Sequence, residues 1–371
     1  MSLNDFVTLG RSGLRVSPLS LGTMTFGGTT GWGTDESLSL SIFNRYLELG
    51  GNFIDTADGY ADGRSEQFVG KFIADRKLRD TVVLATKFTF NAQSGNPNAG
   101  GNGRKNIYRA LDASLRRLGV DFIDLYWLHA WDRITPAEEV VATLNHLVRD
   151  GKIRHYAFSD VPAWYVARAA TLAEKDSQDR PIALQLEYSL VERSIEREHI
   201  PAAQELGLGV CPWSPLASGF LSGKYQHEAG GARGEGRLEV LKSSPNPVFN
   251  KFTERNWRIL DALLDVSNRL ARPPAQVALN WVATQSGITS CIIGATKLAQ
   301  LDDNVAALSF AIPADLRARL DAASALEPIQ PYIFFSDFIQ ARVTGDVRVQ
   351  AWSPNRTLTQ PPAAKVSAAE K

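Results

Sequence analysis

The sequence has little cysteine and no excess charge of either sign. Its 371 residues include two cysteines, Cys211 and Cys291, too few for a disulfide-dense scaffold, and both lie in apolar runs, which fits a reducing compartment. Its 40 Lys and Arg residues balance 40 Asp and Glu residues, with no run of five or six like charges. The basic field that nucleic acid binding requires is therefore missing, and a small molecule is the favoured partner.

Long apolar runs and a targeting leader are also missing. No apolar stretch reaches the roughly eighteen residues of a membrane-spanning helix, and the start MSLNDFVTLG has neither a basic segment nor an apolar core. We therefore expect no membrane partner and a cytoplasmic location. HExxH and Cys/His ligand spacings do not occur, so no metal site is predicted. The sequence leaves a monomer and a homo-oligomer equally open.

What the sequence does contain is a strand-length apolar run followed by an amphipathic helical pattern, repeated eight times. The runs are apolar almost throughout, as expected of parallel strands covered on both faces. Gly50 and Gly119 each close a helical pattern. The expected strands are 19–24, 52–57, 81–87, 123–129, 155–159, 182–188, 208–213 and 291–294, and the expected helices include 35–50, 104–119, 136–151, 162–176, 194–207 and 298–308.

This alternation predicts an α/β fold, a single (β/α)8 TIM barrel over residues 1–327. A doubly wound open sheet is the alternative, but LGTMTFGG lacks the GxGxxG order of a dinucleotide turn. Residues 5–17 are typical of a β-hairpin that covers the N-terminal mouth of a barrel. A long loop at about 219–250 follows the seventh strand, before helices at 253–271 and 274–285, and residues 328–371 form a C-terminal extension whose last fifteen or so residues should be disordered.

Ionisable residues gather at the ends of three consecutive expected strands, where barrel enzymes place their active sites. Asp55 ends the second strand and leads to Tyr60, Lys87 ends the third, and His129 ends the fourth. A buried charge without a partner costs several kcal/mol of desolvation free energy, so we expect Lys87 to pair with Asp55. An adjacent ammonium lowers the pKa of a tyrosine, which predicts Tyr60 as a proton donor to a carbonyl oxygen that His129 orients. A bound cofactor would then supply hydride.

The segments 51–60 (GNFIDTADGY), 86–87 (TK) and 128–129 (LH) resemble, in order and spacing, the signature of the aldo-keto reductase superfamily. The resemblance extends from residue 8 to about residue 308. It implies a barrel that binds NADPH in extended form, with NADH also possible, and that reversibly reduces an aldehyde or ketone to an alcohol with Asp55, Tyr60, Lys87 and His129. The alternatives are an NAD(P)-linked alcohol or sugar dehydrogenase and a cofactor-sensing channel subunit of the same family; the short segment before Thr8 argues against the latter.

The later strand ends carry groups that suit a nicotinamide dinucleotide. Ser159 and Gln185 can bond a carboxamide, and the ring of Trp213 offers a stacking surface. The family often has Ser-Asn after the fifth strand, whereas this sequence has Ser159-Asp160. Glycines after Trp213 allow close approach to a pyrophosphate, and the segment after the eighth strand resembles the family's adenosine site. The predicted cofactor residues are Gly22, Thr23, Met24, Asp55, Ser159, Gln185, Trp213, Ser214, Pro215, Leu216, Gly219, Leu221, Gly223, Lys224, Gly294, Thr296, Lys297, Gln300 and Asn304.

The expected substrate mouth is aromatic. Trp32 and Trp131 are large apolar surfaces near the catalytic loops, which favours a hydrophobic or ring-bearing carbonyl compound. The predicted substrate residues are Met24, Trp32, Phe88 and Trp131. Arg233 and Arg237 in the long loop either reach the cofactor phosphates or remain solvated surface charges.

Overall fold

The computed structural model describes residues 1–29, 31–228, 231–345 and 347. The chain divides into two compact units, Met1–Leu326 and Glu327–Lys371. In the second unit the described residues form the 3-10 helix η6 (Tyr332–Phe335) and the helix α12 (Asp337–Thr344). The expected disorder at the C-terminus concerns residues outside the described ranges.

The first unit contains an eight-stranded parallel sheet. Its strands are β3 (Leu19–Gly22), β4 (Phe53–Asp55), β5 (Val83–Phe88), β6 (Ile123–Leu128), β7 (Ile153–Ser159), β8 (Ala183–Glu187), β9 (Gly209–Trp213) and β12 (Cys291–Ile293). They are ordered β12-β3-β4-β5-β6-β7-β8-β9. β9 is joined to the segment just before β12 by a bridge between Val210 and Ile288, and the Thr289 N–H donates to the Val210 carbonyl at 2.8 Å. The sheet is thus nearly closed into a barrel, and the predicted (β/α)8 fold is confirmed.

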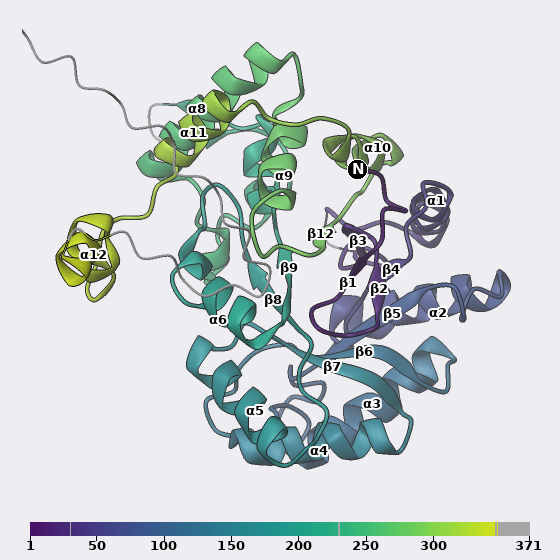
Figure 1. The fold of residues 1–371 in the computed structure, drawn as a ribbon. Helices are drawn as coiled ribbons and strands as arrows, with labels where there is room; N and C mark the ends of the chain where they lie inside the picture. Colours follow the sequence, from purple (N-terminus) through teal and green to yellow (C-terminus); the bar gives the residue numbers. More distant parts are fainter. Residues whose placement is uncertain (30, 229–230, 346, 348–371) are drawn as a thin grey trace, which may run out of the picture. The chain divides into compact units, whose positions relative to one another are not determined.

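Helices surround this sheet, and most of them follow a strand. They are α1 (Glu36–Glu48), α2 (Arg64–Asp75), α3 (Arg104–Leu118), α4 (Ala137–Arg149), α5 (Ala163–Lys175), α6 (His199–Leu206), α8 (Glu254–Leu270), α9 (Pro274–Ala283), α10 (Leu298–Ala306) and α11 (Ala314–Ala323). Figure 1 shows α1 to α6 outside the strands. The Asp35 side chain accepts from the Leu38 N–H and begins α1, and Gly119, at φ 64°, ends α3. The helix α11 was not predicted from the sequence.

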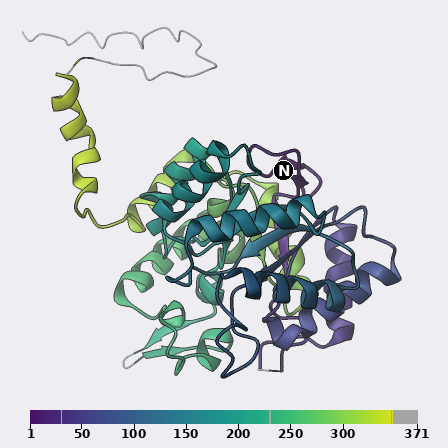
Figure 2. The same cartoon turned by 90° about the horizontal axis from the view of Figure 1, so that it is seen from below.

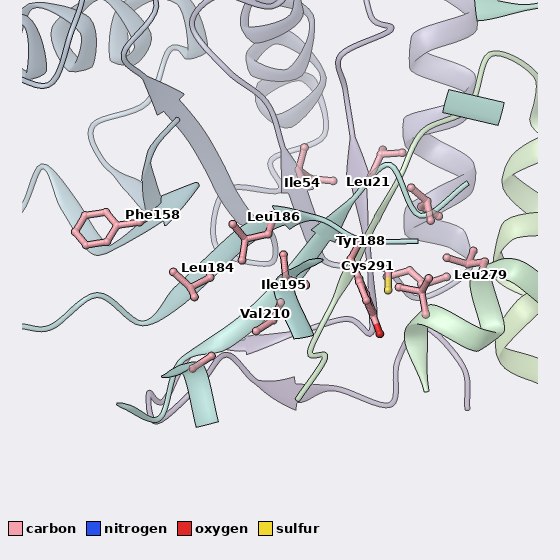
Figure 3. Close-up of a cluster of buried hydrophobic side chains, with 14 of the residues drawn as sticks. Leu21, Ile54, Phe158, Leu184, Leu186, Tyr188, Ile195, Val210, Leu279 and Cys291 are labelled. Carbon is pink, nitrogen blue, oxygen red and sulfur yellow. The ribbon is translucent and has the colours of Figure 1, made fainter. Parts of the chain in front are cut away.

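The alternation of side chains along each strand creates two apolar layers. Outward-facing residues such as Ile54, Phe158 and Leu184 pack beneath the helices, and Figure 3 shows this layer. Inward-facing residues such as Phe53, Leu125 and Trp127 form a second cluster in the barrel interior. The interior is therefore filled at its N-terminal end, which leaves the C-terminal ends of the strands for polar groups.

The expected N-terminal hairpin is present. β1 (Val7–Thr8) pairs with β2 (Arg15–Val16), and the Arg11 N–H donates to the Gly207 carbonyl at 2.7 Å. Leu9 and Val16 belong to the interior apolar cluster. The hairpin thus packs on the N-terminal mouth of the barrel, as predicted.

The long segment after β9 contains more regular structure than the sequence suggested. It includes the 3-10 helices η3 (Ala217–Ser222) and η4 (Pro247–Phe249), the hairpin strands β10 (Gln226–Glu228) and β11 (Gly231–Arg233), and the short helix α7 (Arg237–Val240). His227 stacks on Trp257 of α8 with ring centroids 5.0 Å apart, which anchors the hairpin. In Figure 2 this hairpin projects at one end of the first unit.

The close contact between α2 and α3 leads to a prediction about stability. A Cβ atom at Gly70 of α2 would lie 2.3 Å from the Leu118 carbonyl oxygen of α3. Alanine is the better helix former, but Gly70→Ala should lower the free energy of unfolding by about 1–3 kcal/mol. The added methyl group would force the backbone of α2 and α3 apart. Gly13→Ala is the control, since its added Cβ meets nothing within 4 Å. Denaturant unfolding of both variants measures the difference, and equal stabilities would contradict the contact.

Candidate active site

An ion pair lies at the C-terminal end of the barrel. Lys87 of β5 is fully buried, and its ammonium pairs with the carboxylate of Asp55 on the neighbouring strand β4. Lys87 Nζ also donates to the Thr56 carbonyl at 2.9 Å and to the Tyr60 hydroxyl at 3.1 Å. Three acceptors thus fix the ammonium, and the predicted pairing of Lys87 with Asp55 is observed.

Tyr60 reaches this ion pair through an unusual turn. The Tyr60 N–H donates to the Ala57 carbonyl at 3.2 Å. The next three residues, Ala61, Asp62 and Gly63, have φ values of 49°, 57° and 87°, in the left-handed region. The chain therefore reverses sharply after Tyr60 and enters α2, leaving the phenol against Lys87.

His129 completes the predicted group of four. Its backbone N–H donates to the Phe88 carbonyl at 3.0 Å, and its ring lies edge-on to the Tyr60 ring with centroids 5.9 Å apart. Phe90 covers the imidazole from another side at 4.7 Å. Nδ1 of His129 is buried and has no hydrogen-bond partner among the described residues. A buried, unpaired ring nitrogen is available to a ligand.

Burial controls the protonation states of these groups. Burial raises the pKa of Tyr60, and the Lys87 ammonium opposes that rise without overcoming it. The expected lowering of this pKa is therefore wrong for the structure, and the phenol is protonated at neutral pH. Burial and then the charge of Lys87 hold the pKa of His129 well below its ordinary value, so the imidazole is neutral. Burial disfavours the charge of Lys87, but Asp55 and Tyr60 together hold its pKa above the ordinary value.

A second row of polar side chains lies on the opposite side of the barrel from Asp55. Gln185 Nε2 on β8 donates to Asp55 Oδ2 at 3.1 Å. Ser159 pairs in register with Gln185 and is buried beside it. Asp160 follows, and its Oδ1 accepts from Trp213 Nε1 at 3.2 Å. The hydrogen bond between Gln185 and Asp55 thus connects the four predicted catalytic residues to the predicted carboxamide and stacking residues across the barrel.

A cavity of about 1150 Å³ opens above this surface. It exceeds the roughly 300–1,000 Å³ that is usual for a small-molecule site, which suits a dinucleotide together with a substrate. Both rows of side chains contribute to its lining, with the exception of the Lys87 side chain beneath it. The lining includes these predicted residues: Gly22, Met24, Trp32, Asp55, Tyr60, His129, Ser159, Gln185, Trp213, Ser214, Pro215, Leu216, Gly219, Lys224, Gly294, Thr296, Gln300 and Asn304.

Four predicted cofactor residues do not line the cavity. Thr23 and Leu221 are fully buried, and the Thr23 hydroxyl donates to the Asp55 carbonyl at 3.1 Å, which makes Thr23 a support of the site. Gly223 lies against Pro274 at the base of the segment after β9. Lys297 is exposed at the start of α10.

Two predicted substrate residues lie elsewhere. Phe88 is fully buried and packs on Tyr126 with centroids 4.8 Å apart, because side chains alternate along β5 and Lys87 already faces inward. Trp131 packs edge-on against Trp164, with ring centroids 5.6 Å apart, instead of lining the cavity. Phe90, which the sequence reasoning missed, takes the place expected of Phe88 because Thr89, at φ 128°, interrupts the alternation.

The two arginines of the long loop have different environments. Arg233 is exposed and lies 3.6 Å from Glu228, a surface ion pair. Arg237 lines the cavity, with its guanidinium 4.5 Å from the Trp32 ring centroid and 5.2 Å from that of Phe249. Burial lowers the pKa of Arg237. Arg237 is therefore no solvated surface charge, whereas Arg233 is.

Searches for metal sites and membrane spans found no candidate among the described residues. No group of three or more His, Cys, Asp and Glu side chains there is arranged to hold a metal ion. In the same part of the chain, no helix has the length and apolar character needed to cross a membrane. Cys211 and Cys291 are both free and buried.

Comparison with known proteins gives a consistent result. The model of the Aldo/keto reductase family matches residues 18–325. An aryl-alcohol dehydrogenase of Pestalotiopsis microspora is 34% identical over 310 residues, covering 81% of this chain and 77% of that protein. Norsolorinic acid reductase of Aspergillus flavus is 33% identical over 322 residues, covering 84% and 79%. A probable voltage-gated potassium channel subunit beta of Oryza sativa subsp. japonica is 35% identical over 307 residues, covering 82% and 91%.

Proposed function

The chain belongs to the aldo/keto reductase family of oxidoreductases, and we propose that it reduces an aldehyde or ketone reversibly to an alcohol with NADPH. The contact between the Tyr60 hydroxyl and Lys87 Nζ, 3.1 Å apart at the base of the cavity, carries this proposal. The experiment that tests it measures NADPH consumption with a panel of carbonyl compounds. Absence of turnover with every class of carbonyl would reject the enzymatic proposal.

The proposed chemistry assigns one task to each side chain. A bound nicotinamide cofactor supplies the hydride. Tyr60 gives its proton to the carbonyl oxygen, and Lys87 stabilises the phenolate that remains. Asp55 holds the ammonium in position, and the neutral imidazole of His129 orients the carbonyl oxygen by a hydrogen bond. In the oxidative direction the Tyr60 phenolate takes the proton back.

The segment after β9 has the features of a pyrophosphate site. Ser214, Ser218 and Gly219 have φ values of 54°, 56° and 89°, so the chain turns tightly where it lines the cavity, and Gly219 allows a ligand to approach the backbone closely. Lys224 lines the cavity nearby. Burial and then the charge of Lys297 lower the pKa of Lys224. A phosphate near the two lysines would relieve their repulsion. This supports a dinucleotide cofactor, although the pyrophosphate is common to NADPH and NADH and does not select between them.

The Gly294–Asn304 segment is proposed to hold the adenosine end. Gln300 Oε1 accepts from both the Thr296 N–H at 2.8 Å and its hydroxyl at 3.1 Å. Asn304 Nδ2 donates to the Gly294 carbonyl at 3.3 Å. These bonds brace the turn before α10, and the start of a helix favours a negatively charged phosphate.

Removing the cation of Lys224 tests the phosphate assignment. Lys224→Met should weaken NADPH binding about tenfold, as expected for the loss of a charge-assisted contact to phosphate. Lys175→Met, which changes an exposed lysine at the end of α5, is the matched control. Titration calorimetry gives both dissociation constants. An unchanged affinity for NADPH in the Lys224 variant would contradict the assignment.

The substrate side of the cavity favours a ring-bearing carbonyl compound. Trp32, Phe90 and Phe249 line it together with Met24. The aryl-alcohol dehydrogenase and norsolorinic acid reductase names of two relatives point to the same class. We therefore expect aromatic aldehydes and polycyclic ketones to be better substrates than aldoses. Initial rates of reduction with NADPH or NADH, compared with initial rates of oxidation with NADP⁺ or NAD⁺, distinguish a reductase from an alcohol or sugar dehydrogenase.

The similarity to a potassium channel β subunit supports a second candidate, a cofactor-binding subunit of a membrane channel. The catalytic groups of the cavity weigh against it, because a binding function alone does not require a phenol held against an ammonium. Slow turnover of every carbonyl offered, together with copurification of a channel subunit, would favour this second function.

A further inference from the structure

Asp160 lies between the proposed carboxamide ligand Ser159 and the proposed stacking ring of Trp213. Its Oδ1 accepts from Trp213 Nε1 at 3.2 Å, and Ser159 Oγ lies 3.5 Å from its Oδ2. We propose, on the basis of the function proposed above, that the Asp160 carboxylate biases cofactor binding toward the oxidised, positively charged nicotinamide. Asp160 would then be a positioning and specificity residue for the cofactor's oxidation state.

The backbone holds this carboxylate in place. The Asp160 N–H donates to the Gln185 carbonyl at 3.2 Å, and its carbonyl accepts from the Trp131 N–H at 3.2 Å. Its φ of 45° lies in the left-handed region, which aspartate and asparagine adopt more readily than most residues. Asp160 also lines the cavity beside Gln185 and Trp213. Its side chain is thus fixed toward the place where the nicotinamide is proposed to bind.

The charges that face Asp160 leave it without a cationic partner. Glu187 on β8 repels its carboxylate, and Lys87 on β5 attracts it from a distance. Lys251 pairs with Glu187 at 2.7 Å, and Lys87 pairs with Asp55. Within the described part of the chain, Asp160 forms no ion pair of its own. A cationic ring in this cavity is therefore the charge that would compensate it.

Because Asp160 titrates, the affinity for oxidised cofactor should depend on pH. Burial raises the pKa of Asp160 to about 7. Only the ionised carboxylate attracts a cationic ring, so affinity for oxidised cofactor should rise as the pH increases through this value. The reduced ring is neutral and gains nothing from the charge. In the reductive direction, the same attraction favours the product form of the cofactor on the enzyme and delays its release.

Calorimetric titration of NADP⁺ and NADPH tests this inference. The measured quantity is the ratio of the NADPH to the NADP⁺ dissociation constant, in which the shared 2′-phosphate and pyrophosphate cancel. Across about pH 6 to about pH 8.5 the wild-type ratio should rise about tenfold, the scale expected for one charge acting within about 10 Å at an effective dielectric constant of about 20. In Asp160→Asn the ratio should stay constant, because the amide accepts from Trp213 Nε1 but carries no charge.

Trp213→Phe is the matched control. It removes the hydrogen bond to Asp160, a bond that lowers the pKa of that carboxyl, and it keeps an aromatic ring. If charge is responsible, the pH trend should persist and move to higher pH. A pH trend that persists in Asp160→Asn, or that Trp213→Phe abolishes equally, would overturn the inference while leaving the enzymatic proposal intact. If the wild-type protein binds neither nucleotide, the proposed function itself is rejected, and the inference with it.

Discussion

Tyr60→Phe should lower kcat for carbonyl reduction by at least about three orders of magnitude, because the Tyr60 hydroxyl is the proposed proton donor to the developing alkoxide. The phenol is buried and in contact with Lys87, and its raised pKa keeps it protonated at neutral pH. Removing the hydroxyl leaves the aromatic ring, so the shape of the cavity is conserved. NADPH oxidation with an aromatic aldehyde measures the loss.

Cofactor binding separates a catalytic role of Tyr60 from a structural one. The variant should bind NADPH with an affinity close to that of the wild type, since the hydroxyl bonds Lys87 and not the segments proposed to hold the dinucleotide. Tyr165→Phe provides the control, because Tyr165 is a buried tyrosine whose hydroxyl has no hydrogen-bond partner among the described residues. Turnover that survives in Tyr60→Phe would reject the proton-donor assignment.

Lys87→Met should lower both turnover and stability by large amounts. The Asp55 carboxylate is 1% exposed, and its charge is compensated by the Lys87 ammonium. Without that ammonium, an uncompensated charge remains in the barrel, and the free energy of unfolding should fall by about 3–5 kcal/mol. Turnover should fall with it, because the Tyr60 phenolate loses its stabilising cation. Urea unfolding and NADPH oxidation measure the two effects.

A double variant separates the two losses. The double variant Asp55→Asn/Lys87→Met has neither charge. Its asparagine at position 55 can still accept the hydrogen bond that Gln185 donates to Asp55. Stability should recover most of its loss, whereas turnover should stay low. If turnover recovers together with stability, Lys87 acts only through folding and the proposed phenolate stabilisation is wrong.

The barrel was predictable because its signals are local and repeated. Buried parallel strands produce continuous apolar runs, and glycines such as Gly119 mark helix ends, so the eight strands were identified within a few residues. The helix α11 was missed since only Leu316 and Leu320 among its residues are buried, too few for a visible apolar stripe. The ordered elements at 217–249 were missed because they depend on contacts such as His227 on Trp257, between residues far apart in the sequence.

The site residues at the ends of strands were predictable from the sequence. The residues whose orientation depends on a change in backbone direction were not. Asp55, Lys87 and Gln185 were predictable because each lies at the end of a buried strand, and a barrel gathers the ends of its parallel strands at one mouth. Phe88 and Phe90 were exchanged because a single residue, Thr89, interrupts the alternation. The direction of the Tyr60 pKa shift was predicted wrongly, since the sequence reveals the neighbouring cation but not the depth of burial that outweighs it.

The seam of the barrel between β9 and β12 has a consequence for how the protein responds to its cofactor. A single bridge joins β9 to the residues just before β12, and the segments that follow the two strands, Ser214–Lys224 and Gly294–Asn304, line the same cavity from the two sides of the seam. A molecule bound to both segments contacts them only when the ring is closed. By mass action, a bound nucleotide would therefore oppose opening of the barrel at this seam. The free energy of unfolding should then increase with the nucleotide concentration in the cell.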